Sequence, residues 1–259
     1  MHILTVAGHL LLAWAVGLAV TTAFLDLGPG LMRDHPPRER RITGAVIGPL
    51  ALIGCGLLLV TCPFPVGLCI AAPFALMAAV YSVAWVRGWR PVTRRVLGWQ
   101  TGVVGVVSLL ALVLTAGPLE WHGGVVIAAY AASAGLLGGL TCLAVKAFFG
   151  AHEEDVELTV SPFGIPARVV SFGLGIAVLG AFDVIGWLLG GHADWLPAMG
   201  TWLGLSLAVP ALLTGLGHKF FPRMQRPIWA AALVSAIGGQ AAIHAVTLFN
   251  PGLIPPAIL

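Results

Sequence analysis

Uninterrupted apolar runs recur along the whole of this 259-residue chain, and they constrain its fold more than any other feature. A run of about 20 such residues crosses a hydrocarbon layer of roughly 30 Å as a helix. Only 9% of the residues are charged and the mean hydropathy is +0.99, whereas a soluble domain has roughly 25% charged residues. The chain is therefore predicted to be an all-α membrane protein and not a water-soluble globule.

Breaks rich in glycine, proline or charge divide the chain into eight predicted transmembrane helices. The first run has neither a basic leader nor a cleavage pattern, so it is expected to be a retained span and not a signal peptide. No connection is long enough to fold alone, so residues 1–259 form one integral membrane domain and any soluble catalytic domain is expected on another chain. The predicted spans are Ile3–Leu27, Ile42–Thr61, Val66–Val86, Val96–Ala116, Gly123–Phe149, Ala167–Leu189, Leu196–Gly217 and Ile228–Phe249.

The basic residues predict how these spans are oriented. All 13 Lys and Arg fall in or beside the odd-numbered connections between spans, and the even-numbered connections have none. Positively charged loops stay in the cytoplasm, so both termini are predicted to lie outside, in a bacterial cytoplasmic (inner) membrane. This placement also explains the net charge of +3 without a nucleic-acid partner.

Two short segments favour an internal duplication. Residues 72–76, Ala-Pro-Phe-Ala-Leu, resemble residues 209–213, Val-Pro-Ala-Leu-Leu, and an Arg-Pro pair follows each at nearly the same spacing. A true duplication would give two parallel four-helix bundles, with halves at 1–116 and 117–259. Chance similarity is the alternative, because the matching segments are short and common in composition.

Prolines and glycines inside the spans predict local features of packing. Pro49, Pro73 and Pro210 are expected to kink their helices, because proline removes a backbone donor. Glycines four residues apart allow helix backbones to approach closely, although a chain with 34 glycines also has such spacings by chance. The five pairs are Gly44/Gly48, Gly98/Gly102, Gly135/Gly139, Gly186/Gly190 and Gly200/Gly204.

Polar side chains within the spans are the main pointers to function, because burying them in hydrocarbon is costly. Counted from the outer ends of the spans, His9, Tyr130, Asp183 and His244 all lie roughly 8 to 10 Å inside. A carboxylate, two histidines and a tyrosine at one depth can relay protons and bind a quinone head group. The alternative for each is a hydrogen bond between helices. We predict that Asp183, His244 and His9 carry the chemistry and that Tyr130, Gln240 and His122 help to bind the head group.

Heme and metal sites are not expected. His9 and His244 are the only pair of intramembrane histidines that could ligate a heme from two sides, and they lack the partners of a second site. The four cysteines have no CxxC or Cys/His spacing. Residues 120–122 and 192–194, which contain His122 and His192, could form a shallow metal site, but solvated turns explain them better. The motifs of hydrolases, nucleotide-binding proteins and prenyltransferases are missing from the sequence.

The first span resembles a known family. Residues 4–17, LTVAGHLLLAWAVG, look like the opening helix of the membrane anchor subunits of dimethyl sulfoxide reductase-type enzymes, which are similar in plan to polysulfide reductase anchors. The resemblance implies eight spans, termini outside, and a quinol site near the outer face that passes electrons to an iron-sulfur subunit without heme. The segments His-Leu-Gly-x-Pro and Ser-Trp-x-Ser-x-Glu associated with that family are missing, so no site residue is carried over.

Two hypotheses of function follow. In the first, the chain is a non-heme anchor subunit of a multi-subunit oxidoreductase, which binds menaquinone or ubiquinone and contacts membrane lipid, an iron-sulfur subunit and a catalytic subunit. In the second, it is a small proton-coupled transporter or channel, with substrate passing the proline-containing helices and Asp183 coupled to protons. A transporter moves solute alone in liposomes, whereas an anchor does nothing without its partners.

Overall fold

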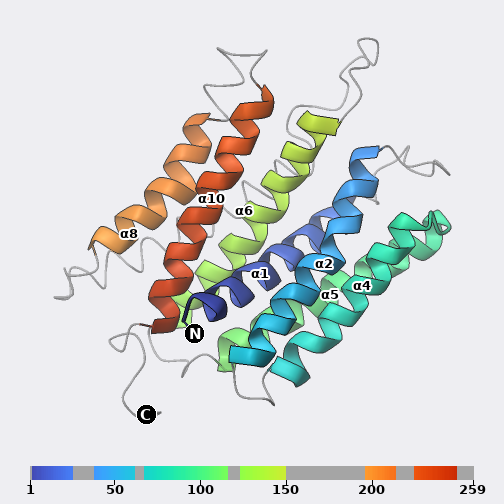
Figure 1. Ribbon diagram of the computed structural model, residues 1–259, viewed down its shortest axis with the longest axis horizontal. Helices are drawn as coiled ribbons and strands as arrows, with labels where there is room; N and C mark the ends of the chain where they lie inside the picture. The colour runs from blue at the N-terminus through green and yellow to red at the C-terminus, as the bar shows by residue number, and fades with distance from the viewer. Residues whose placement is uncertain are drawn as a thin grey trace.

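The computed structural model describes residues 2–25, 38–61, 67–115, 123–149, 196–213 and 225–249, and these residues are helical apart from the turn at 87–90. Two short π-helical stretches, η1 (Gly67–Ala71) and η3 (Gly204–Ala208), directly precede further helical residues. The α-helices are α1 (His2–Leu25), α2 (Arg38–Thr61), α4 (Ala72–Val86), α5 (Pro91–Thr115), α6 (Gly123–Phe149), α8 (Leu196–Leu203) and α10 (Gln225–Phe249) (Figure 1).

Six helical stretches among the described residues are long and apolar enough to cross a membrane, so the chain is a multi-pass helical membrane protein. They correspond to predicted spans one to five and span eight. The seventh prediction is represented by a shorter apolar helix, Gly200–Leu213, and the sixth, Ala167–Leu189, lies outside the described residues. The six stretches are Ile3–Leu25, Arg38–Thr61, Cys69–Val86, Pro91–Val113, Tyr130–Phe149 and Arg226–Ala245.

Two helices begin earlier than their predicted spans. α2 begins at Arg38 and α5 at Pro91, whereas the apolar runs begin at Ile42 and Val96. A helix need not end where hydrophobicity ends, because Arg carries its charge to the membrane surface on a long apolar stem. Proline is also favoured as the first residue of a helix, where its missing N–H has no partner to lose.

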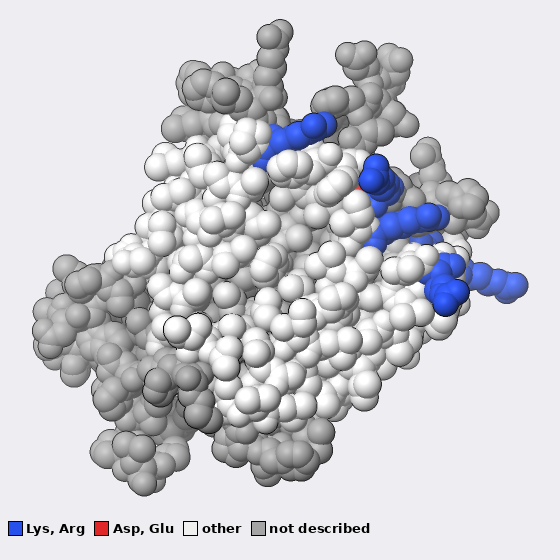
Figure 2. Space-filling model, viewed as in Figure 1, with Lys and Arg blue, Asp and Glu red and all other residues white. Residues whose placement is uncertain are grey.

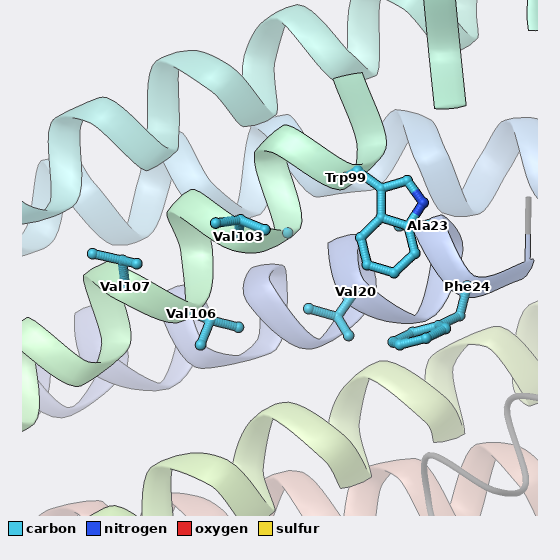
Figure 3. A pocket seen from close by; sticks show the side chains of 8 residues that line it. Val20, Ala23, Phe24, Trp99, Val103, Val106 and Val107 are labelled. Carbon is cyan, nitrogen blue, oxygen red and sulfur yellow. The ribbon is translucent and has the colours of Figure 1, made fainter. Parts of the chain in front are cut away.

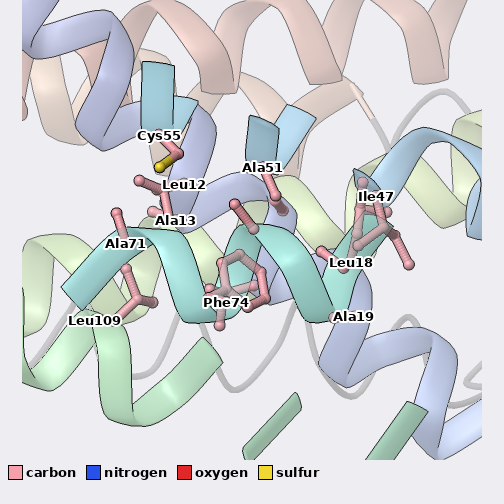
Figure 4. Close-up of a cluster of buried hydrophobic side chains, with 14 of the residues drawn as sticks. Leu12, Ala13, Leu18, Ala19, Ile47, Ala51, Cys55, Ala71, Phe74 and Leu109 are labelled. Carbon is pink, nitrogen blue, oxygen red and sulfur yellow. The ribbon is translucent and has the colours of Figure 1, made fainter. Parts of the chain in front are cut away.

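α1 lies at the centre of the bundle and contacts α2, α5, α6 and α10. Its residues Leu12 and Leu18 are fully buried and belong to a core that also includes Ile47 of α2 and Phe74 of α4 (Figure 4). Because lipid tails are as apolar as these side chains, close van der Waals packing between them, and not removal from water, holds α1, α2, α4 and α5 together.

The closest helix contact lies between α1 and α6. A Cβ atom on Gly17 would lie 1.8 Å from the carbonyl oxygen of Ala134, and one on Gly138 would lie 2.3 Å from the carbonyl carbon of Gly17. One turn along α1, Trp14 Nε1 donates to Thr141 Oγ1 at 2.8 Å. Only glycine permits this approach.

One of the predicted glycine pairs forms a helix contact in the structure, and another does not. Gly44 and Gly48 pack directly against Trp85 and Ser82 of α4, so this pair forms a helix contact. Gly200 and Gly204 have nothing within 4 Å of an added Cβ atom among the described residues, so no contact accounts for that pair.

Pro73 and Pro210 each lie two residues after the end of a π-helical stretch. Each ring would clash with the carbonyl four residues earlier in a regular α-helix, and those carbonyls belong to Cys69 in η1 and Ser206 in η3. A π turn changes the spacing at that position and accommodates the ring. Residues 67–73 and 204–210 also share the pattern Gly-Leu-x-x-Ala-x-Pro, so the similarity noted in the sequence extends upstream and coincides with the same backbone conformation.

Ser82 inserts its hydroxyl into the backbone ladder of α2. Its Oγ accepts a hydrogen bond from the Gly48 N–H at 2.7 Å and donates to the Gly44 carbonyl at 2.8 Å. These two backbone groups would bond directly in a regular helix. The next residue, Pro49, has no N–H, so the α2 ladder is interrupted at adjacent positions.

We expect Ser82→Ala to destabilise the protein by about 0.6 to 1.7 kcal/mol, the range measured for hydrogen bonds between membrane helices. The variant leaves the Gly48 N–H and the Gly44 carbonyl without the bridging hydroxyl. Denaturation in mixed micelles measures the change. Thr43→Val is the control, since the Thr43 hydroxyl bonds only within α2, to the Glu39 carbonyl. Equal stability of the Ser82→Ala and wild-type proteins would contradict a stabilising role for the inserted hydroxyl.

Candidate functional site

Four of the six candidate residues lie together where α1, α6 and α10 meet. His9 is on α1, Tyr130 is on α6, and Gln240 and His244 are on α10. The three helices contact one another pairwise (Figure 1). A residue that was not predicted, Ser133 of α6, completes the group, which we call the polar cluster.

Tyr130 links the two histidines of the polar cluster. Its hydroxyl is hydrogen-bonded to His9 Nδ1. Its ring meets the His9 ring edge to face at 5.7 Å between centroids, and the His244 ring in the same way at 4.6 Å. The tyrosine ring therefore lies against both imidazoles.

Ser133 joins the two polar residues of α10. Its hydroxyl donates to Gln240 Oε1 at 2.7 Å, and its oxygen lies 2.9 Å from His244 Nε2. Since the single hydroxyl proton is directed to Gln240, this arrangement requires His244 Nε2–H to donate to Ser133 Oγ. A neutral His244 then has Nδ1 as its acceptor nitrogen. The amide nitrogen of Gln240 is buried and has no hydrogen-bond acceptor among the described residues.

The side chains of the polar cluster are almost entirely buried. Ser133, Gln240 and His244 are fully buried, Tyr130 is 1% exposed, and His9, at 4%, is the most exposed member. Buried polar groups of this kind are stable only when they are hydrogen-bonded, which explains the dense bonding within the cluster. His9 is the member best placed to meet a molecule that approaches from the surface.

The cluster lies far from the basic end of the bundle. Arg226 Nε donates to the Ala147 carbonyl at 3.2 Å, and the Arg38 guanidinium lies 5.6 Å from the centre of the Phe149 ring, so the starts of α2 and α10 meet the end of α6. At about 1.5 Å per residue, the cluster is roughly 20 to 27 Å from that level. Nine described residues define this basic end (Figure 2): Arg38, Arg40, Arg41, Arg87, Arg90, Arg94, Arg95, Lys146 and Arg226.

The other two candidates, Asp183 and His122, lie outside the described residues, and their roles stay predictions. Ser133 had a signal in the sequence that was not used. It lies three residues after Tyr130 in a helix, and residues at that spacing share a face. Burying a serine in a membrane, however, costs much less free energy than burying an ionisable group, so a single serine in a span does not by itself indicate a functional site.

Among the described residues, no group of three or more His, Cys, Asp or Glu side chains could hold a metal ion. Comparison of the chain with protein-family models, curated proteins and solved structures gives no match. The fold and the cluster therefore define the class of protein, a helical multi-pass membrane protein with a buried hydrogen-bonded polar cluster.

Proposed function

We propose that the chain is the non-heme membrane anchor subunit of a multi-subunit oxidoreductase and that the polar cluster exchanges protons with a quinol. The observation that carries the proposal is the convergence of His9, Tyr130 and His244 in one hydrogen-bonded group within the membrane-spanning part of the chain. Ionisable residues at such depth mark proton and substrate pathways. The electrons pass to an iron-sulfur subunit, and a third, catalytic subunit uses them.

The proposal includes eight spans, with both termini outside a bacterial cytoplasmic membrane. The gathering of basic residues at one end of the described helices supports this orientation, because positively charged ends face the cytoplasm (Figure 2). The polar cluster then lies in the outer half of the membrane. Protons released there leave on the outer side.

The donors and acceptors of the cluster fit a quinone or quinol head group, whose carbonyls accept and whose hydroxyls donate hydrogen bonds. When bound, the quinol supplies two electrons and two protons. With Tyr130 donating to His9 Nδ1, a neutral His9 has its proton on Nε2 and can donate to a carbonyl. In the other tautomer, His9 Nδ1–H donates to Tyr130 and Nε2 accepts from a hydroxyl. The His9–Tyr130 pair can thus serve both forms of the head group.

Purification of the full chain from native membranes in mild detergent tests this function. We expect an iron-sulfur subunit and a catalytic subunit to co-elute in fixed stoichiometry, and solvent extraction of the complex to yield menaquinone or ubiquinone. A lone chain that contains no quinone would contradict the anchor function.

A proton-coupled transporter is the second candidate, supported by the repeated Gly-Leu-x-x-Ala-x-Pro segments. α1 packs on α5 and α6 packs on α10, which is the pairing expected of two similar halves at 1–116 and 117–259. Many transporters consist of two such repeats and bind substrate where they meet, and the polar cluster contains residues of both proposed halves. Proton-driven solute uptake by the chain alone in liposomes would favour this function over the anchor.

A further inference from the structure

The basic end of the bundle has an excess of positive charge around the start of α5. Glu39 is the only acidic residue that the described part of the chain contains, against the nine Lys and Arg of the basic end. Arg94 is only 4% exposed, and its guanidinium lies 4.6 Å from the centre of the Trp85 ring. Its Nε and Nη1 have no acceptor among the described residues. A buried charge without a counter-charge is costly, so this region favours an anionic ligand.

An apolar groove of about 250 Å³ runs between α1 and α5 (Figure 3). Gly102 deepens the groove, because an added Cβ atom there would meet only Val20, at 3.6 Å. The valines on its α5 side are 44 to 59% exposed, so the groove is open to the surrounding hydrocarbon. Its walls include Val20 and Phe24 of α1 and Trp99, Val103 and Val106 of α5.

One end of the groove lies one helical turn from a basic residue, Arg95. Trp99 and Phe24 meet edge to face, with 5.2 Å between ring centroids, at the end nearer the start of α5. Arg95 lies one helical turn before Trp99 and therefore on the same face of α5. An acyl chain in the groove would have its head group at the level of Arg95.

We propose that the groove and Arg95 bind one anionic phospholipid from the leaflet at the basic end. One acyl chain lies between α1 and α5, and the phosphate lies beside Arg95 in the positive field that Arg94 strengthens. A basic site between membrane helices is a recurring way of holding anionic head groups. This site is independent of the polar cluster and of the function proposed for it.

Native mass spectrometry of the full chain, with phosphatidylglycerol or phosphatidylcholine of identical acyl chains, tests the site. We expect the wild-type protein to retain phosphatidylglycerol preferentially and Arg95→Gln to weaken that binding by about fivefold, since one basic residue near a membrane surface contributes about 1 kcal/mol. Val106→Phe fills the groove and should lower retention of both lipids.

Two matched variants serve as controls. Arg87→Gln removes a basic residue at the end of α4, and Val80→Phe enlarges a side chain on the surface of α4 that is 43% exposed, as Val106 is 44% exposed. Both should leave lipid retention unchanged. Equal retention of the two lipids by the wild-type protein would overturn the proposal. The proposal would also be overturned if Arg87→Gln and Arg95→Gln reduced phosphatidylglycerol binding equally. A third contrary result would be inorganic phosphate that displaces the lipid and still binds to the Val106→Phe variant.

Discussion

Gly17→Ala is expected to separate α1 from α6 and to destabilise the protein more than any other single methyl group we can add to the described helices. The new Cβ atom would lie 1.8 Å from the Ala134 carbonyl oxygen. The clash is with backbone, so no side chain can rotate to relieve it, and the helices must move apart. Overpacking of a core costs about 1 to 3 kcal/mol, and we expect the upper part of that range or more, because separation also breaks the bond between Trp14 and Thr141.

Thermal denaturation in detergent, followed by size-exclusion chromatography, measures this effect. Gly56→Ala is the matched control, since nothing in the described structure lies within 4 Å of its added Cβ atom. Gly102→Ala is a second control at an ordinary contact distance of 3.6 Å. Gly138→Ala should behave like Gly17→Ala. Wild-type stability in both the Gly17 and Gly138 variants would mean that the two helices do not cross at these residues.

If the chain is the proposed anchor subunit, His244→Ala is expected to lower quinol-dependent turnover of its complex by about 10² to 10⁴, the usual contribution of a positioned acid or base. The side chain lies against Tyr130 and bonds to Ser133, so its loss removes one of the two imidazoles of the polar cluster. His9→Ala and Asp183→Asn, the other predicted proton carriers, should give losses of the same order.

Assembly must be measured beside turnover, because each variant also changes a buried contact. Co-elution of the partner subunits should stay as in the wild type. Ser206→Ala removes another buried hydroxyl, on η3 and outside the cluster. It should leave turnover within about twofold of the wild type, because the Ser206 hydroxyl has no hydrogen-bond partner among the described residues and so its loss breaks no bond of the cluster. Full turnover in intact complexes of both His244→Ala and His9→Ala would exclude the cluster from the proton pathway.

The transmembrane character of the chain could be predicted because hydropathy alone determines it. The exact helix ends could not, since Arg38 and Pro91 extend helices beyond the apolar runs. The contact between Gly17 and Gly138 was also missed. The predicted glycine pairs each lie on one helix, whereas this contact takes one glycine from each of two helices that are distant in the sequence.

A common level along the bundle for three of the site residues could be predicted, but the side of each helix on which they lie could not. Counting residues placed His9, Tyr130 and His244 at one level, yet spans that are apolar all round give no sign of which side faces a neighbour. Helix packing fixes that rotation, and it brought Ser133 into the group. The π turns before Pro73 and Pro210 likewise depend on how the chain accommodates a proline ring, which hydropathy does not register.

The crossing of α1 with α6 can form only after a delay during biosynthesis, because the two helices are distant in the sequence. Gly17 and Gly138 are 121 residues apart, so the ribosome has still to make that length of chain when Gly17 has been added. At about 5 to 20 residues per second, this takes roughly 6 to 24 s. During that interval lipid or an insertion factor has to cover the face of α1 that holds Gly17. Variants that weaken the crossing are expected to lengthen the time for which this face lacks its partner helix.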